Sequence, residues 1–120
     1  MSDKKIRGGS LIARALKDKG IKHVFTLSGG FCNPALEGFM ECQMEVINCP
    51  HEQIAGHIAD GHTRITRKPT VCLVGPEGFA NAVPSMMEAW GERSPVIFIT
   101  GYSSLKRQGL GGFKEIDDVA

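Results

Sequence analysis

Residues 70–78 read Thr-Val-Cys-Leu-Val-Gly-Pro-Glu-Gly, and this stretch decides the fold. Its first half is almost continuously apolar, which is typical of a strand covered on both faces in a parallel sheet. Gly75 and Pro76 end the strand, and an apolar pattern of helical period begins at Phe79. A buried strand, a tight turn at residues 75–78 and a helix, in this order, predict one unit of an α/β protein.

The same alternation of strand and helix extends in both directions along the chain. The sequence predicts strands at residues 23–27, 45–49, 70–75 and 95–100, and helices at residues 10–19, 33–42, 52–66 and 79–90. Such alternation implies right-handed crossovers between parallel strands. We therefore predict a three-layer α/β fold, a parallel sheet with helices on both faces. Within the third helix, six residues recur at helical period and predict a single apolar stripe: Ile54, Ala55, Ile58, Ala59, His62 and Ile65.

Length and composition limit the class of protein. The 120 residues suffice for one domain, and we expect residues 1–7 to be a tail and residues 8–120 to form the domain, incomplete at its C-terminal end. The net charge of +1 and the lack of a basic run argue against nucleic acid as a partner. No signal peptide and no apolar run long enough to span a membrane are present. The four cysteines form no Cys-x-x-Cys pair, so we expect reduced thiols in a cytoplasmic protein.

The residues that directly follow the predicted strands locate a site. Gly29 and Gly30 follow the first predicted strand, Glu52 follows the second, residues 75–78 follow the third and Gly101 follows the fourth. In open α/β sheets, ligands bind beyond the carboxyl ends of the strands. The sequence therefore predicts a ligand site at this edge of the sheet, without identifying the ligand.

Three simple interpretations of these residues lead to different chemistry. A zinc site would need two histidines four residues apart on one helix, but His51 and His57 are six apart, and His57 and His62 are five apart. A nucleotide site at residues 75–78 lacks the glycine-rich phosphate-binding motifs, so a plain tight turn is an alternative. Glu52, considered by spacing alone, is also consistent with an acid that complements the dipole of a helix start.

A series of short motifs runs along nearly the whole chain, and their order is more specific than any one of them. They are Leu-Ser-Gly-Gly at 27–30, His-Glu-Gln at 51–53, Ala-Asp-Gly at 59–61, Val-Gly-Pro-Glu-Gly at 74–78, Asn-Ala at 81–82, Ser-Pro-Val at 94–96, Ile-Thr-Gly at 99–101 and Gly-Phe-Lys-Glu-Ile-Asp at 112–117. In this order they resemble the N-terminal, pyrimidine-binding domain of thiamine diphosphate-dependent enzymes, in the group of acetolactate synthase, benzaldehyde lyase and 2-hydroxyacyl-CoA lyase.

The resemblance implies roles for individual residues. In this family the glutamate at the position of Glu52 hydrogen-bonds N1′ of the aminopyrimidine and so activates thiamine diphosphate. By the same correspondence, Phe31 and Lys114 are expected on the substrate side. The residues expected to contact the cofactor, besides Glu52, are Gly29, Gly30, Pro76, Gly78 and Asn81. Asn81 is alternatively only a helix-start residue.

The resemblance also implies groups that this chain does not hold. Mg²⁺ and the diphosphate are bound in the family by a separate domain with a Gly-Asp-Gly stretch, which this sequence lacks, so no metal ligand is expected here. Some members bind FAD on a middle domain, and no residue here supports a flavin. The family site forms between two subunits, so we expect a homodimer or tetramer, or a partner subunit that carries the diphosphate-binding domain. Self-association would also cover the apolar side chains of Phe79, Met86 and Met87.

Three departures from the family pattern affect the predicted site. The turn at residues 74–78 is one residue shorter than usual and contains an additional acid, Glu77. Lys114 replaces a glutamine, which would favour an anionic substrate unless the lysine is simply solvated, and His62 replaces a tyrosine.

Two functions are consistent with these features of the sequence. The first is the pyrimidine-binding half of a thiamine diphosphate-dependent carboligase, lyase or decarboxylase that acts on 2-keto acids or related carbonyl donors. The alternative is a non-catalytic, stand-alone homologue that serves as an oligomerisation or partner-binding module.

Overall fold

A parallel four-stranded sheet forms the centre of the protein in the computed structural model, which describes residues 5–115. The strands are β1 (His23–Thr26), β2 (Glu45–Asn48), β3 (Thr70–Val74) and β4 (Val96–Thr100), in the spatial order β2-β1-β3-β4. All three pairings are parallel, with Val24 opposite Val71 and Val71 opposite Ile97. β3 lies inside the sheet and every one of its residues is buried, as its apolar run predicts.

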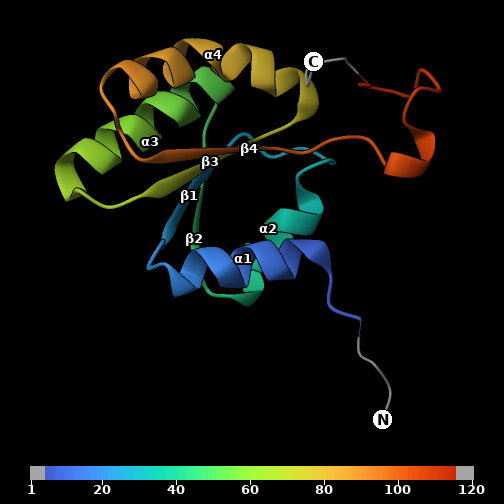
Figure 1. The fold of residues 1–120 in the computed structure, drawn as a ribbon, viewed down its shortest axis with the longest axis horizontal. Coiled ribbons are helices and arrows are strands. Elements are labelled where there is room, and N and C mark those ends of the chain that lie inside the picture. The colour runs from blue at the N-terminus through green and yellow to red at the C-terminus, as the bar shows by residue number, and fades with distance from the viewer. Residues whose placement is uncertain (1–4, 116–120) are drawn as a thin grey trace.

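Two helices cover each face of the sheet, so the predicted three-layer α/β fold is confirmed (Figure 1). α1 (Gly8–Asp18) and α2 (Asn33–Glu41) pack together on one face, and α3 (Glu52–Thr66) and α4 (Pro76–Gly91) pack together on the other. A short 3₁₀ helix, η1 (Leu105–Arg107), follows β4. No helix among residues 5–115 is long and apolar enough to cross a membrane.

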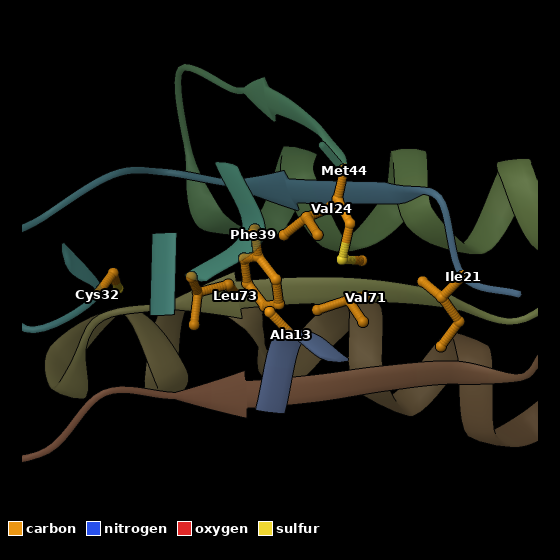
Figure 2. Packing of buried hydrophobic residues seen from close by; sticks show 8 residues of the cluster. All are labelled: Ala13, Ile21, Val24, Cys32, Phe39, Met44, Val71 and Leu73. Atoms are coloured by element: carbon orange, nitrogen blue, oxygen red, sulfur yellow. The ribbon is translucent and has the colours of Figure 1, made fainter. Parts of the chain in front are cut away.

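The core divides into two clusters because alternate strand residues point to opposite faces of the sheet. Val24, Val71 and Leu73 point toward α1 and α2, where they pack around Phe39 (Figure 2). Phe25 and Cys72 belong to the cluster under α3 and α4. Complete burial of one such large side chain stabilises the fold by about 1.5–3 kcal/mol.

All four cysteines are free thiols, and three of them are buried. The pKa of Cys72 is raised to about 12, first by burial and then by the nearby Cys49 and Glu52. The thiol of Cys72 therefore stays protonated and acts as a small apolar side chain.

On each face of the sheet, the two helices approach each other closely at a glycine. A Cβ atom on Gly9 of α1 would lie 1.7 Å from the carbonyl oxygen of Pro34 in α2. A Cβ atom on Gly56 of α3 would lie 1.9 Å from Oγ of Ser85 in α4. The absence of a side chain at these positions lets the helices of each layer approach closely.

Two predicted features of α3 and β4 are wrong, and the packing explains both. Because α3 approaches α4 closely at Gly56, the apolar side chains of α3 that are buried are the small ones, Ala55 and Ala59, whereas Ile54, Ile58 and Ile65 are exposed. The single predicted stripe is therefore divided between two faces. The apolar run of β4, like that of β3, predicts a strand covered on both faces, but β4 is an edge strand with one neighbour and is only partly buried.

The third correction concerns the segment after β3. α4 begins at Pro76 rather than at residue 79, with Gly75 as its N-cap. Proline suits the first helical position because its fixed φ angle matches the helix and its missing N–H is not needed there. The predicted turn at residues 75–78 is thus the N-cap and first turn of a helix.

Candidate functional site

The carboxyl edge of the sheet contains a cavity of about 210 Å³, formed where loops after β1 and β3 meet the start of α3. Its wall combines residues from distant parts of the sequence: Leu27, Ser28, Gly29, Gly30, Phe31, Glu52, Gly75, Pro76, Glu77 and Lys114. Six of the predicted site residues therefore lie around one cavity. Gly78 and Asn81 do not line it, and they contact Glu52 from α4 instead.

Glu52 is the first residue of α3 and only 9% exposed. The preceding residue, His51, caps the helix, and its Nδ1 accepts a hydrogen bond of 3.1 Å from the backbone N–H of Gln53. The helix start directs its unpaired N–H groups and the positive end of its dipole toward the carboxylate. The cap at His51 thus begins the helix at the point that places Glu52 in the cavity wall.

Asn81 holds the carboxylate of Glu52 from the neighbouring helix. Its Nδ2 donates a hydrogen bond of 3.1 Å to Oε2 of Glu52. Asn81 lies within α4 and not at the helix start, so the alternative of a helix-start residue is wrong. The contact restricts the orientation of the carboxylate relative to the cavity.

Gly78 makes room for Glu52. A Cβ atom at residue 78 would lie 2.7 Å from Oε1 and 2.8 Å from Cγ of Glu52, closer than packed atoms allow. Because Gly78 and Asn81 lie one helical turn apart on α4, the same helix face both leaves space for the carboxylate and hydrogen-bonds it.

The cavity wall also contains an ion pair between α4 and the segment after η1. Nζ of Lys114 contacts Oε1 of Glu77. The pKa of the Glu77 carboxyl lies below its ordinary value, first because Lys114 hydrogen-bonds to it. Lys114 is therefore neither simply solvated nor an unpaired cation, since the additional acid of residues 74–78 is its partner.

The loop that contains Gly29, Gly30 and Phe31 is held against the end of β4. The backbone N–H of Cys32 donates to the carbonyl oxygen of Gly29 at 2.8 Å, which closes a turn. A Cβ atom at Gly101 would lie 2.4 Å from the carbonyl oxygen of Phe31. The sequence placed Gly101 at this edge of the sheet but did not predict its contact with Phe31, although a glycine directly after a strand is a usable signal for a close backbone approach.

The histidines of α3 contribute to structure rather than to this cavity. His62 packs against His23, with ring centroids 4.6 Å apart, and against Phe25 of β1. Its pKa is lowered by burial first and by the nearby His23 second. Among residues 5–115, no group of three His, Cys, Asp or Glu side chains is arranged to hold a metal ion.

A cavity at the carboxyl edge of a parallel α/β sheet, with a buried glutamate in its wall and glycines around it, defines a small-molecule-binding domain of the open-sheet class. A family model described as the N-terminal TPP binding domain of thiamine pyrophosphate enzymes matches residues 6–120. This chain belongs to that family.

Relatives with several different names are similar to this chain in sequence. The chain is 38% identical to the acetolactate synthase large subunit IlvG of Mycobacterium tuberculosis over 95% of its own length and 21% of the relative's. It is 32% identical to 2-hydroxyacyl-CoA lyase 2 of Danio rerio, over 94% of this chain and 18% of that protein. Sulfoacetaldehyde acetyltransferase of Roseovarius nubinhibens is 31% identical, over 89% of this chain and 18% of the relative. The chain thus spans about a fifth of the length of these relatives.

Solved structures agree with the fold. A putative thiamin diphosphate-dependent enzyme from Mycobacterium smegmatis superposes with a TM-score of 0.83 at 22% identity, covering 92% of this chain and 21% of that one. The thiamine diphosphate-dependent 4-hydroxybenzoylformate decarboxylase of Rhodococcus jostii RHA1 gives the same TM-score and identity, covering 91% of this chain and 21% of that one. At this identity the likeness shows the α/β fold alone.

Proposed function

We propose that this chain is the pyrimidine-binding half of a thiamine diphosphate-dependent carboligase, lyase or decarboxylase that acts on 2-keto acids or related carbonyl donors. One observation carries the proposal: Glu52 lies buried at the head of α3, in the wall of the cavity, with its carboxylate held by Asn81. The similarity to a 2-hydroxyacyl-CoA lyase and to an acetolactate synthase large subunit supports this range of reactions.

Glu52 would share a proton with N1′ of the aminopyrimidine. A carboxylate suits this role when it is shielded from water and its orientation is restricted, because its interaction with a ring nitrogen is then strong and directional. When bound, thiamine diphosphate supplies the electron sink for bond cleavage or formation beside a carbonyl carbon.

The remaining wall residues would position the cofactor and substrate. Gly29, Gly30 and Pro76 line the cavity and offer small surfaces that a ring can approach closely. Phe31 and Lys114 border the same space and would face the substrate. Mg²⁺ and the diphosphate would be held by a diphosphate-binding domain outside the described residues, in a cytoplasmic assembly.

In this proposal, a partner subunit covers the outer face of α3 and α4. We name as the outer apolar face the exposed side chains Ile54, Ile58, Ile65, Val83, Met87 and Trp90. Phe79 and Met86, expected to be exposed, instead pack partly against the core. The outer apolar face would be covered by another subunit, either a second copy in a homodimer or tetramer or a chain with the diphosphate-binding domain.

The test is the exchange of the cofactor's C2 proton for deuterium, followed by NMR in the assembly of this chain with its diphosphate-binding domain. Glu52→Gln should slow the exchange by two orders of magnitude or more, since the amide cannot share a proton with N1′ in the same way. Glu92→Gln, on an exposed residue after α4, is the matched control and should leave the exchange rate unchanged. An unaltered rate in Glu52→Gln would remove Glu52 from the proposed role.

A second candidate function is a non-catalytic module for oligomerisation or partner binding. The outer apolar face favours it, because this surface needs no cofactor to bind a partner. Under this candidate, substitutions at Glu52 leave assembly and every measured activity unchanged, while substitutions on the outer apolar face prevent assembly.

A further inference from the structure

A second cavity shares the side chain of Phe31 with the first. Its volume is about 380 Å³, and its wall contains Phe31, Ser103, Ser104, Arg107, Gly112 and Phe113. Phe31 lines both cavities, and the consecutive residues Phe113 and Lys114 line one cavity each. The two spaces are therefore neighbours.

One polar group in the wall of this second cavity lacks a partner. Oγ of Ser103 is buried, and no hydrogen-bond partner for it is present among residues 5–115. A buried hydroxyl without a partner is unfavourable, because it has lost water and gained nothing in return. A ligand in the cavity that accepts or donates a hydrogen bond would satisfy this group.

Arg107 gives the second cavity a positive charge. The two acids of the neighbouring segments are already engaged, Glu77 by Lys114 and Glu115 by the backbone N–H groups of Gly109 and Gly112. No carboxylate within residues 5–115 forms an ion pair with Arg107. The guanidinium is thus available for a ligand, and its planar set of donors fits a carboxylate with two parallel hydrogen bonds.

The rest of the wall is aromatic. Phe31 and Phe113 contribute rings, and Phe113 is 80% exposed, so it leaves apolar surface that a ligand could cover. One cation, one unpaired hydroxyl and two aromatic rings match a molecule with a carboxylate at one end and an apolar substituent beside it. A highly charged phosphate compound matches less well, because Arg107 is the one cation among residues 5–115 that lines the space.

We propose that the second cavity is a substrate subsite that binds the carboxylate of an apolar, preferably aromatic, 2-oxo acid through Arg107 and Ser103. This inference rests on the proposed function and narrows its substrate class. Phe31 and Phe113 would flank the apolar substituent, and Phe31 would separate it from the cavity that contains Glu52.

The test measures binding of phenylglyoxylate to the ¹⁵N-labelled chain by NMR titration, with its neutral methyl ester as comparison. The acid should shift the amide signals of Phe31, Ser103 and Arg107 and should bind at least tenfold more tightly than the ester. Arg107→Gln should weaken binding of the acid about tenfold and bring it to the level of the ester. The matched control is Lys106→Gln, which removes a neighbouring cation that does not line the cavity and should leave binding unchanged.

Several outcomes would overturn the inference. They are no shift at these residues, equal affinity for acid and ester, equal effects of Arg107→Gln and Lys106→Gln, or inorganic phosphate binding as tightly as the acid. Glu52→Gln should retain phenylglyoxylate binding while it slows C2 exchange in the assembly. Loss of the exchange effect alone would therefore contradict the proposed function, and loss of acid selectivity alone would contradict the subsite.

Discussion

Asn81 on α4 donates a hydrogen bond of 3.1 Å to the carboxylate of Glu52 on α3. The two residues are far apart in the sequence, and the contact joins the two helices that cover the same face of the sheet. The glutamate proposed to activate the cofactor is thus oriented by the packing of a neighbouring helix, and substitutions on α4 should alter its chemistry.

Asn81→Ala removes the donor to Glu52. Because a hydrogen bond to a charged group contributes about 1.5–3 kcal/mol, we expect C2 exchange in the assembled enzyme to slow by roughly 10- to 100-fold. NMR measurement of the exchange rate tests this. Glu92→Gln, at an exposed position directly after the same helix, serves as control and should have no effect on the rate. A normal rate in Asn81→Ala would show that Glu52 does not depend on this contact.

Gly78→Ala places a methyl group against Glu52. Its Cβ would lie 2.7 Å from Oε1, so the carboxylate or the helix must move, and we expect a loss of about 1–3 kcal/mol in the free energy of unfolding. Gly91→Ala makes the same change at the end of α4, where the new Cβ meets no atom within 4 Å, and should be neutral or slightly stabilising. Urea unfolding of both variants measures the difference, and equal stabilities would contradict the close packing at Gly78.

Trp90→Ser alters the outer apolar face. Trp90 is 83% exposed in this chain, so the substitution should change the stability of the single chain by less than about 0.5 kcal/mol. If a subunit covers this face, loss of a large aromatic side chain should weaken association by about 2 kcal/mol or more, roughly 30-fold. Sedimentation equilibrium measures this, with Leu105→Ser, which is equally exposed but lies in η1, as control. Association that is insensitive to Trp90 would place the interface elsewhere.

His62 should make the fold sensitive to acid. Its pKa in the folded chain is lowered, first by burial and then by His23, so protonation favours the unfolded state. Stability from this residue is present above the unfolded pKa of about 6.5 and decreases as the pH falls below it, toward the lower folded pKa. Urea unfolding at about pH 7.5 and pH 5.5 should show the loss. His62→Gln should reduce this loss, whereas His57→Gln, on a less buried site beside Glu88, should retain it.

The sequence predicts much of the architecture because the signals for it are local. The apolar runs at β1 and β3, the glycines after the strands and the helix start at Glu52 each depend on a few neighbouring residues. Since parallel strands end at one edge, these local signals also place Glu52 and the glycines of the site together. The family pattern added the expected role of Glu52, which spacing alone left open between a ligand-site residue and a helix-start acid.

The errors of prediction lie where two elements meet. The isoleucines of α3 follow a helical period, but α4 approaches closely at Gly56, and the buried apolar side chains of α3 are Ala55 and Ala59. Residues 75–78 contain two glycines and a proline, which suggest a turn, yet Pro76 begins a helix because helical φ angles suit it at that position.

By itself, the sequence determined the order of strands and helices, the parallel α/β class and the edge at which Glu52 lies. These follow from hydrophobic periodicity and turn chemistry within short windows. Only the tertiary structure decided that Asn81 orients Glu52, that Lys114 pairs with Glu77 and that Arg107 lines a cavity with Phe31. Such contacts join residues distant along the chain, and they depend on the angles and distances at which helices and loops pack, which no local pattern encodes.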